Sequence, residues 1–310
     1  MRLIWQGIES DLMMPDNDYY GHRTAMARYC GLKQLSPAVF GSIRHGWQPD
    51  LGSIGDRTLK AAPIFVWNER EQRQAAERAI PNVVAIGAPF LYGVASLQPG
   101  TTDPRAGLGT IVFPLHSDGF TEALQDRQRF IDEVEHHEQG PFTVSIYYQD
   151  LDRPGAVEPY RRAGWRVVSF GTRDDPQFMP RLILELQSHA AVVSDVLCSA
   201  IWYGAHLGRR VRILGAPPSL SDRALPDGLA QRWPEVHGDG VSGARARDLA
   251  AIELGVDHLR SPDELAQVLG WRSWHRYAAP LVRLAVDARH GSELRRGQPL
   301  SRTMRRTGGA

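Results

Sequence analysis

The alternation of apolar and polar positions is most regular between residues 106 and 215. Short apolar, β-branched runs typical of buried strands take turns with longer segments whose apolar residues recur at helical spacing. The expected strands span residues 109–117, 142–148, 165–171, 190–195 and 209–215. The expected helices span residues 120–139, 157–164, 176–189 and 196–208. Because adjacent parallel strands need helical crossovers, this order predicts an α/β fold with a doubly wound parallel sheet.

The first hundred residues alternate in the same way but less regularly. Expected strands there span residues 41–47, 62–68 and 82–90, and a strongly polar helix is expected over 69–79. Residues 97–109 are rich in proline, glycine and threonine and lack an apolar period, which is typical of a linker. The pattern therefore predicts two Rossmann-like units, of which the N-terminal one is the smaller.

Three domain ranges follow from this division. Residues 1–105 form the expected N-terminal α/β domain, on the acceptor side, and residues 106–290 the expected C-terminal, nucleotide-donor-binding domain. Residues 291–310 contain five arginines with no acid between them. We expect this basic tail to be disordered, with contact to anionic lipid headgroups as the alternative.

Composition limits the kind of protein further. The chain has 310 residues, of which 42% are hydrophobic and 23% charged, as is ordinary for a soluble globular protein. The net charge of +1 excludes a global field that would steer the chain to nucleic acid. Two cysteines outside any CxxC spacing argue against a disulfide framework or a zinc knuckle. Without a signal-peptide core or a long apolar window, we expect a cytoplasmic protein, at most peripheral at the inner membrane face through its tail.

Familiar signatures such as GxxxxGK[ST], HExxH, GxSxG and a complete GxGxxG are missing from the sequence. Polar and turn-forming residues instead lie at or just after the carboxyl ends of the expected strands, where open parallel sheets bind ligands. These residues are His45, Asn68, Glu69, His116, Ser117, Asp150, Gly171, Thr172, Ser194 and Asp195. Because they come from both units, they favour a ligand site between the two domains.

Two strand–turn–helix segments carry several of these residues. His116 and Ser117 precede a helix start, where free N–H groups and the helix dipole suit a phosphate; alternatively, the serine is only an N-cap. Ser194, Asp195 and Ser199 flank the start of the next such helix, whose small residues permit close approach of a ligand or simply tight packing. Asp195 suits a ribose or sugar hydroxyl better than a phosphate.

The remaining candidates each have two interpretations. Asp150 and Asp152 form a DxD pair that suits Mg²⁺ or Mn²⁺, although a plain turn is the simpler explanation. Glu69 is either a general base or an ordinary acid at the start of a polar helix. His45 is either a reacting group at a strand end or a structural histidine beside the aromatic Trp47.

Four segments in order resemble GT-B type glycosyltransferases of bacterial surface-polysaccharide synthesis: "RHGWQ" (44–48), "IGAPFLY" (86–92), "FPLHS" (113–117) and "SDVLCSAIWYGAHLG" (194–208). This set of enzymes includes capsule, lipopolysaccharide and teichoic-acid-like transferases. The likeness covers most of residues 40–215 in order and spacing. It implies transfer of a sugar, or a polyol phosphate, from a nucleotide-activated donor to a polysaccharide or glycolipid acceptor, in the cleft between two domains. It also implies that no bound metal or other cofactor is needed.

The resemblance also implies roles for single residues. His45 would accept the proton of the acceptor hydroxyl, and Glu69 is the second catalytic candidate. Arg173 is the nearest candidate for the basic phosphate ligand that such families often carry. The implied donor-side residues are His116, Ser117, Gly171, Thr172, Arg173, Ser194, Asp195 and Ser199.

Two other functions stay open at this point. The first is a GT-A type, metal-dependent transferase that uses Asp150 and Asp152. The second is a non-catalytic nucleotide- or sugar-binding protein on a degenerate transferase scaffold, to which the short N-terminal part points. That brevity also suggests that a partner subunit, as in a homodimer, completes the N-terminal part.

Overall fold

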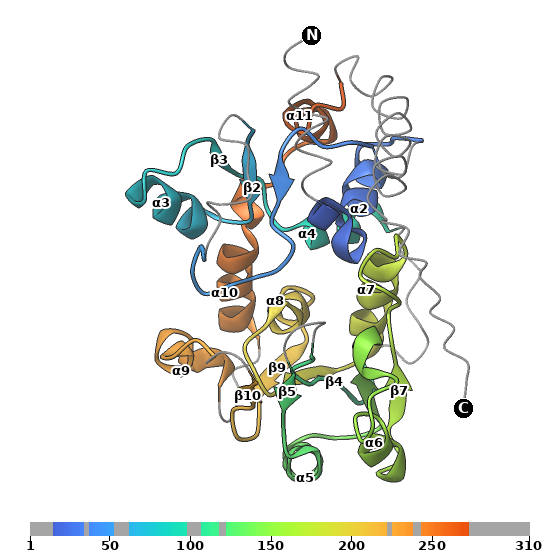
Figure 1. Cartoon of the computed structure of the whole chain (residues 1–310). Coiled ribbons are helices and arrows are strands. Elements are labelled where there is room, and N and C mark those ends of the chain that lie inside the picture. Colours follow the sequence, from blue (N-terminus) through green and yellow to red (C-terminus); the bar gives the residue numbers. More distant parts are fainter. Residues whose placement is uncertain are drawn as a thin grey trace, which may run out of the picture.

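The computed structural model describes residues 15–33, 37–52, 62–97, 107–117, 122–221, 225–237 and 243–272. Figure 1 shows two α/β units, one above the other, with helix α10 running between them along one side. The expected domain boundary at residues 105 and 106 and the expected basic tail, 291–310, fall outside the described residues and stay predictions.

The N-terminal unit is built on a three-stranded parallel sheet in the order β1-β2-β3. Its elements are η1 (Pro15–Gly21), α2 (His22–Tyr29), β1 (Ser42–Ile43), β2 (Ile64–Val66), α3 (Glu69–Glu77), β3 (Val83–Ala85) and α4 (Pro89–Ser96). The expected polar helix, α3, begins after its N-cap Asn68, whose side chain accepts a hydrogen bond from the Glu71 N–H. The expected strand 82–90 ends early, because Gly87 has a φ of 78° and Pro89 starts α4.

The C-terminal unit is built on a five-stranded parallel sheet in the order β7-β6-β4-β8-β9. Its strands are β4 (Thr110–Phe113), β6 (Phe142–Ser145), β7 (Arg166–Val168), β8 (Ala191–Ser194) and β9 (Arg210–Ile213). Its helices are α5 (Arg127–His137), α6 (Glu158–Arg162), α7 (Phe178–Ser188) and α8 (Ser199–His206). If the five strands are numbered 1 to 5 in chain order, their order across the sheet is 3-2-1-4-5. This is a doubly wound order. The expected fold class, α/β with two Rossmann-like units, is therefore confirmed.

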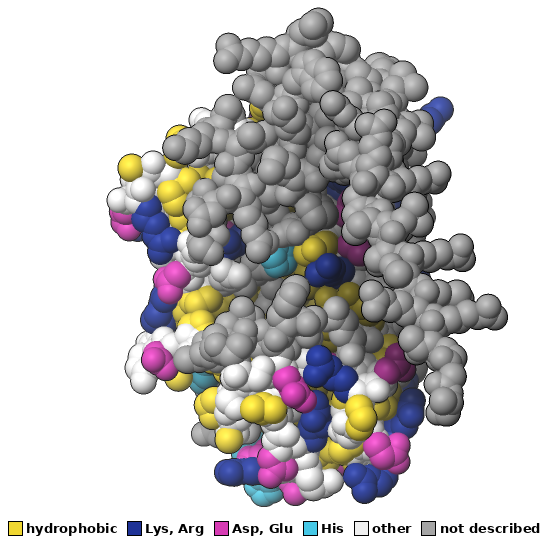
Figure 2. Space-filling view, in the orientation of Figure 1, with side chains coloured by type: hydrophobic (Ala, Val, Ile, Leu, Met, Phe, Trp, Pro, Cys, Tyr) yellow, Lys and Arg dark blue, Asp and Glu magenta, His cyan; other side chains and the backbone are white. Residues whose placement is uncertain are grey.

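Shorter elements complete the C-terminal unit. They are β5 (Ala123–Leu124), η2 (Tyr148–Asp150), β10 (Ser219–Leu220), α9 (Leu229–Arg232) and η3 (Pro234–Val236). The helix expected over 120–139 begins only at Arg127, because residues 123–124 pair with β10 and Asp126 caps the helix. Figure 2 shows acidic and basic side chains interspersed over the visible face of this unit. None of the helices in the described ranges combines the length and the apolar character needed to cross a membrane.

The chain returns to the N-terminal unit at the end of the described part. The elements of this return are α10 (Ala244–Leu254), η4 (Val256–His258) and α11 (Pro262–Val268). α10 packs against α8, and α11 packs against α2, where Leu265 and Trp271 share a buried cluster with Ile43 of β1. Gly255 permits the turn between them, because its φ is 70° and a side chain there would collide with the Trp67 carbonyl. The expected range of the C-terminal domain did not anticipate this return.

One hydrophobic core runs through both units. Ala25, Phe90 and Leu91 of the N-terminal unit are buried in the same cluster as Ile183 and Tyr203 of the C-terminal unit. The rings of Phe90 and Tyr203 stack with their centroids 3.9 Å apart. Burial of apolar surface between the two units stabilises their contact. The two units therefore form one packed body rather than two lobes joined only by a linker.

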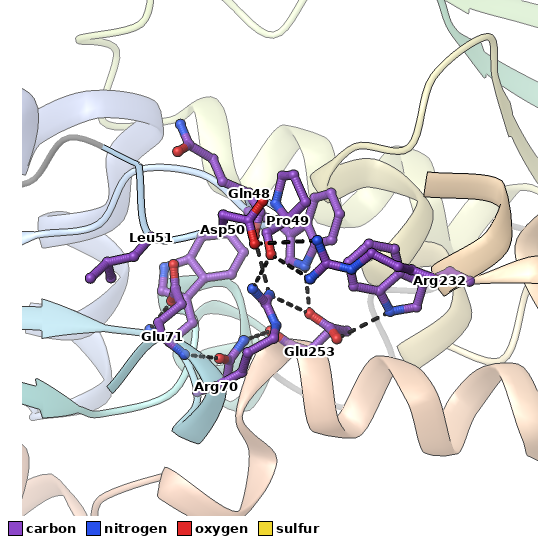
Figure 3. A network of polar contacts seen from close by, with 12 residues as sticks. Gln48, Pro49, Asp50, Leu51, Arg70, Glu71, Arg232 and Glu253 are labelled. Carbon is purple, nitrogen blue, oxygen red and sulfur yellow. Dashed lines mark hydrogen bonds and ion pairs between the residues drawn. The ribbon is translucent and has the colours of Figure 1, made fainter. Parts of the chain in front are cut away.

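A buried carboxylate lies where the two units meet α10. Glu253 of α10 is only 6% exposed, and it accepts hydrogen bonds from the indole N–H groups of Trp47, at 2.7 Å, and Trp233, at 3.2 Å. The Arg70 guanidinium, from α3, donates to the same carboxylate at 2.7 Å (Figure 3). Trp47 belongs to the loop that follows β1, so this carboxylate fixes the loop on which His45 lies.

We expect the substitution Glu253→Ala to lower the free energy of unfolding by about 2–4 kcal/mol, because it removes the acidic partner of Arg70 and the acceptor of two indole N–H groups. Glu253→Gln keeps one acceptor oxygen and should lower it by about 1–2 kcal/mol. Urea denaturation followed by tryptophan fluorescence measures both, with Glu77→Ala on the exposed side of α3 as the control. A loss below about 0.5 kcal/mol for Glu253→Ala, typical of surface substitutions, would contradict this role.

Candidate functional site

The strand order of the C-terminal sheet reverses between β4 and β8. In a doubly wound sheet, the loops that leave two such strands run to opposite faces, and a crevice opens at their carboxyl ends. Residues 114–117 follow β4, and residues 195–198 connect β8 to the start of α8. The fold itself therefore places a ligand site beside these two loops.

The loop after β1 of the N-terminal unit reaches this switch point. The backbone N–H of Trp47 donates a hydrogen bond of 3.0 Å to the hydroxyl of Ser199, the first residue of α8. Gly46 lies beside the same hydroxyl, because a Cβ added there would be 3.8 Å from Ser199 Oγ. The predicted site residues His45 and Ser199 therefore lie in neighbouring positions, although they come from different units.

The His45 imidazole lies among aromatic rings. Its centroid is 5.6 Å from that of the Tyr19 ring and 6.3 Å from that of Tyr20. The Arg173 guanidinium also lies over the Tyr19 ring, 4.4 Å from its centroid. Tyr19 thus contacts both the predicted base and the predicted phosphate ligand. We call Tyr19, Tyr20, His45, Arg173 and Ser199 the strand-end cluster.

Tyr20 has an unusual backbone conformation. Its φ of 58° and ψ of 20° lie in the left-handed region, which bulky residues rarely adopt. Its N–H donates to the Arg173 carbonyl over 2.5 Å, and a Cβ added at Gly21 would lie only 3.0 Å from Pro176 O. Strained residues persist where surrounding contacts hold them, and they gather at functional sites. Contact between the two units therefore holds this turn in place.

A second histidine, His22, adjoins the cluster. It is 1% exposed, and its ring centroid lies 5.9 Å from that of Tyr20. Burial, with a smaller contribution from the neighbouring His45, lowers the pKa of His22 to about 3. His22 is therefore neutral near neutral pH, so it is an uncharged neighbour to His45 rather than a competing cation.

His116 is connected to the cluster through a stacked tyrosine. Its exposed ring lies 4.1 Å from that of Tyr147, with an angle of 28° between the planes. Burial raises the pKa of Tyr147, and the neighbouring Tyr20 side chain raises it further. Tyr147 and Tyr20 therefore lie between His116, a predicted donor-side residue, and His45.

Two buried carboxylates hold the loop after β4. The Leu115 N–H donates to Asp195 at 2.7 Å, and the Ser117 N–H donates to Asp150 at 2.9 Å. Amides in such positions are the usual ligands of a phosphate at a helix N-terminus. Because carboxylates already fill these positions, a phosphate can use the two amides only by displacing Asp150 and Asp195.

Among the predicted donor-side residues, Asp195 is a buried carboxyl group with a strongly raised pKa. Its burial raises its pKa to about 7, against the opposing effects of the Leu115 hydrogen bond and of Arg127. The Gln125 side-chain amide donates to Asp195, while Gln125 Oε1 is buried and has no partner among the described residues. A rotated Gln125 amide would present that oxygen to a protonated Asp195. Asp195 therefore exchanges a proton close to neutral pH.

Three other predicted donor-side residues shape the loops around the switch point. The Ser194 hydroxyl donates to the Phe113 carbonyl at 2.6 Å and so joins the ends of β8 and β4. Gly171, with a φ of 100°, and Thr172, whose carbonyl accepts the Asp175 N–H, form the turn that presents Arg173. Their direct contact with a nucleotide stays a prediction.

The acidic candidates lie outside the strand-end cluster. Glu69 is exposed on α3 and pairs with Arg73 one turn further along the helix. Asp150 is buried and pairs with Arg153, whereas Asp152 is exposed. Within the described ranges, no group of three or more His, Cys, Asp or Glu side chains is placed to hold a metal ion. The positions of these residues thus give no further support to Glu69 as a general base or to a metal site at Asp150 and Asp152.

Sequence reasoning did not identify Tyr19, Tyr20 and Tyr147. The first two lie in a polar stretch without apolar periodicity, and their only local signal is an aromatic pair followed by glycine. Tyr147 follows β6 at the carboxyl end, where its position could have been recognised by the rule that identified His45.

No protein-family model matches the chain, and a search of curated proteins found no match. Similar solved structures include a putative UDP-N-acetylglucosamine 2-epimerase from Listeria monocytogenes, with 12% identity over 74% of this chain and 59% of that chain and a TM-score of 0.37. Os79 from O. sativa, in complex with UDP and deoxynivalenol-3-glucoside, shows 11% identity over 68% and 55%, with a TM-score of 0.31. The lipopolysaccharide outer core galactosyltransferase WaaB shows 12% identity over 71% and 62%, with a TM-score of 0.27. The chain spans less than two thirds of the length of each of these structures.

We expect Asp195→Asn to change how stability depends on pH. Unfolded aspartate ionises near pH 4, whereas folded Asp195 keeps its proton until about pH 7. The contribution of protonated Asp195 to the free energy of unfolding is therefore complete below about pH 4. As the pH rises from about 4 to about 7, this contribution decreases by up to about 1.4 kcal/mol per pH unit. Urea denaturation from pH 5 to 8 should show the advantage of the natural protein over the variant shrinking with pH. The exposed Asp132→Asn is the control, and a difference that stays constant would contradict the expectation.

Proposed function

We propose that the protein transfers a sugar, or a polyol phosphate, from a nucleotide-activated donor to a glycan or glycolipid acceptor at the strand-end cluster. The observation that carries this proposal is that His45 and Arg173, which follow strands of different sheets, both lie against the ring of Tyr19. Such a transfer needs a base on one side of the reacting bond and a group that neutralises phosphate on the other. The GT-B resemblance of the sequence suggests the same class of reaction.

In this reaction His45 accepts the proton of the acceptor hydroxyl while that oxygen forms its bond to the anomeric carbon, or to phosphorus for a polyol phosphate. At the same time, the bond between the attacked atom (the anomeric carbon or phosphorus) and the donor's leaving phosphate oxygen breaks. The leaving phosphate keeps the electron pair of that bond. Arg173 lies on the C-terminal side of the cluster, where it would neutralise the developing charge. Imidazole suits the base because its protonation changes near neutral pH.

Arg173 is favoured as the phosphate ligand over the amides after β4. The Leu115 and Ser117 N–H groups already donate to carboxylates. Arginine, by contrast, presents several N–H donors in a planar fork that matches phosphate oxygens. The remaining proposed donor-side residues are His116, Ser117, Gly171, Thr172, Ser194, Asp195 and Ser199.

A nucleotide screen by thermal shift is the first test. A nucleotide that binds only the folded chain raises its unfolding midpoint, so we expect a response to one of CMP, UDP or GDP. The responding base then names the donor series for transfer assays. Binding without turnover of any matching donor would support the non-catalytic binding protein instead.

The base is tested with His45→Ala, using the donor so identified. We expect kcat to fall by about 10²–10⁴, since general bases contribute on this order, while donor affinity changes by less than about twofold. His136→Ala, on the exposed side of α5, is the matched control and should keep full activity. A fall in kcat smaller than about tenfold would remove His45 from the mechanism. Activity lost in EDTA and restored by Mn²⁺ would favour the metal-dependent alternative.

A further inference from the structure

Three arginines lie over aromatic rings in the described part of the chain. Arg70 and Arg232 lie over Trp233, at 5.9 and 4.5 Å from the ring centroid, and Arg173 lies over Tyr19 at 4.4 Å. A cation above an aromatic face is attracted by the negative charge of that face. The three pairs are therefore alike in the contact that holds the guanidinium.

The three pairs differ in the acceptors to which the guanidinium N–H groups donate hydrogen bonds. Arg70 donates to Glu253 and to the carbonyls of Gln48 and Pro49, and Arg232 donates to Asp50 and Pro49 (Figure 3). Both arginines therefore use their donors to join parts of the chain.

Arg173 has no such acceptor among the described residues, and its side chain is half-buried. Partial burial lowers the pKa of Arg173, but Tyr19, Tyr148 and the carboxylate of Asp174 outweigh that effect, so the net shift is upward. The guanidinium thus stays charged, and no acceptor within the described ranges occupies its donors. This is the arrangement of a binding group rather than of a structural ion pair.

The backbone holds Tyr19 and Arg173 together independently of their side chains. Tyr20, the neighbour of Tyr19, donates its N–H to the Arg173 carbonyl, and it does so in a strained left-handed conformation. The Tyr19 ring also borders His45. The ring is thus placed to set the direction of the Arg173 side chain relative to His45.

We propose that Tyr19 is a positioning residue that holds the Arg173 guanidinium flat against its ring, so that the N–H edge meets the diphosphate of the donor. This inference rests on the proposed function and names the part of the substrate that the C-terminal side of the cluster recognises. A guanidinium fixed on a ring loses less conformational freedom when it binds two phosphate oxygens together.

Binding of inorganic pyrophosphate to the full chain, measured by calorimetry, tests the proposal without knowledge of the nucleotide. We expect Arg173→Gln to raise the Kd about 10- to 100-fold, since it removes charge-assisted hydrogen bonds. Tyr19→Leu should raise it about three- to tenfold, and Tyr19→Phe, which keeps the ring face, should stay within about twofold. Arg129→Gln, an exposed arginine of α5, removes the same charge and should leave the Kd unchanged.

A double-mutant cycle separates positioning from general damage. In the Arg173→Gln background, Tyr19→Leu should weaken binding by less than about twofold further, because the group that it positions is gone. A full loss in that background, or an equal loss in Tyr19→Phe, would overturn the positioning role and leave Arg173 as the phosphate ligand. Pyrophosphate binding unaffected by Arg173→Gln would instead overturn the phosphate assignment of the proposed function.

If Tyr19→Leu does not unfold cooperatively, Tyr19→Trp replaces it. Indole is the best aromatic partner for a cation, so this variant should bind pyrophosphate at least as tightly as the natural protein, within about twofold. Pyrophosphate binding about tenfold weaker in a folded Tyr19→Trp variant would overturn the proposal.

Discussion

The position of the strand-end cluster depends on the buried carboxylate of Glu253. A charge removed from water is stable only where donors replace the lost hydration. The three donors of Glu253 come from the loop after β1, from α3 and from the segment that precedes η3. Trp47 and Glu253 are 206 positions apart in the chain. Compensating one carboxylate therefore fixes several distant segments at once, including the loop that carries His45.

A similar principle organises the loop after β4. Asp150 and Asp195 accept backbone N–H groups that the fold would otherwise leave at the mouth of the sheet. These two hydrogen bonds hold the loop after β4 in one conformation. Because the two loop amides already have acceptors, we propose the side chain of Arg173, rather than these amides, as the anion-binding group.

The interface between the units contributes in two ways. Its apolar part, in which Phe90 stacks on Tyr203, makes the units one body. Its polar rim places Tyr19 and Tyr20 of one unit against Arg173 of the other. The conformation of Tyr20 is unfavourable by itself and persists because this contact holds it. Groups from both units thereby keep fixed positions around His45.

Much of the fold was predictable from sequence, because strand and helix periods are local properties. The five apolar runs after residue 106 correspond to the five strands of the C-terminal sheet, and their helical crossovers imply parallel pairing. The segment from Val83 to Ser96 was harder to predict, because a short apolar run fits a strand or a helix equally well until Gly87 and Pro89 divide it. α2 has no strong apolar period and owes its place to packing against α4.

For the candidate site as well, some residues could be predicted from the sequence and others could not. The strand-end rule indicated His45, because parallel strands bring polar residues at their carboxyl ends to one edge. Ser199 was indicated by its place at a helix start, and Arg173 only by the resemblance to GT-B transferases. Tertiary structure decided that Glu69 faces solvent, that Asp195 is buried against Leu115, and that Tyr19 joins His45 to Arg173. The physical reason is that periodicity depends on neighbours in the chain, whereas burial, charge compensation and the partners of a side chain depend on residues that only folding brings together.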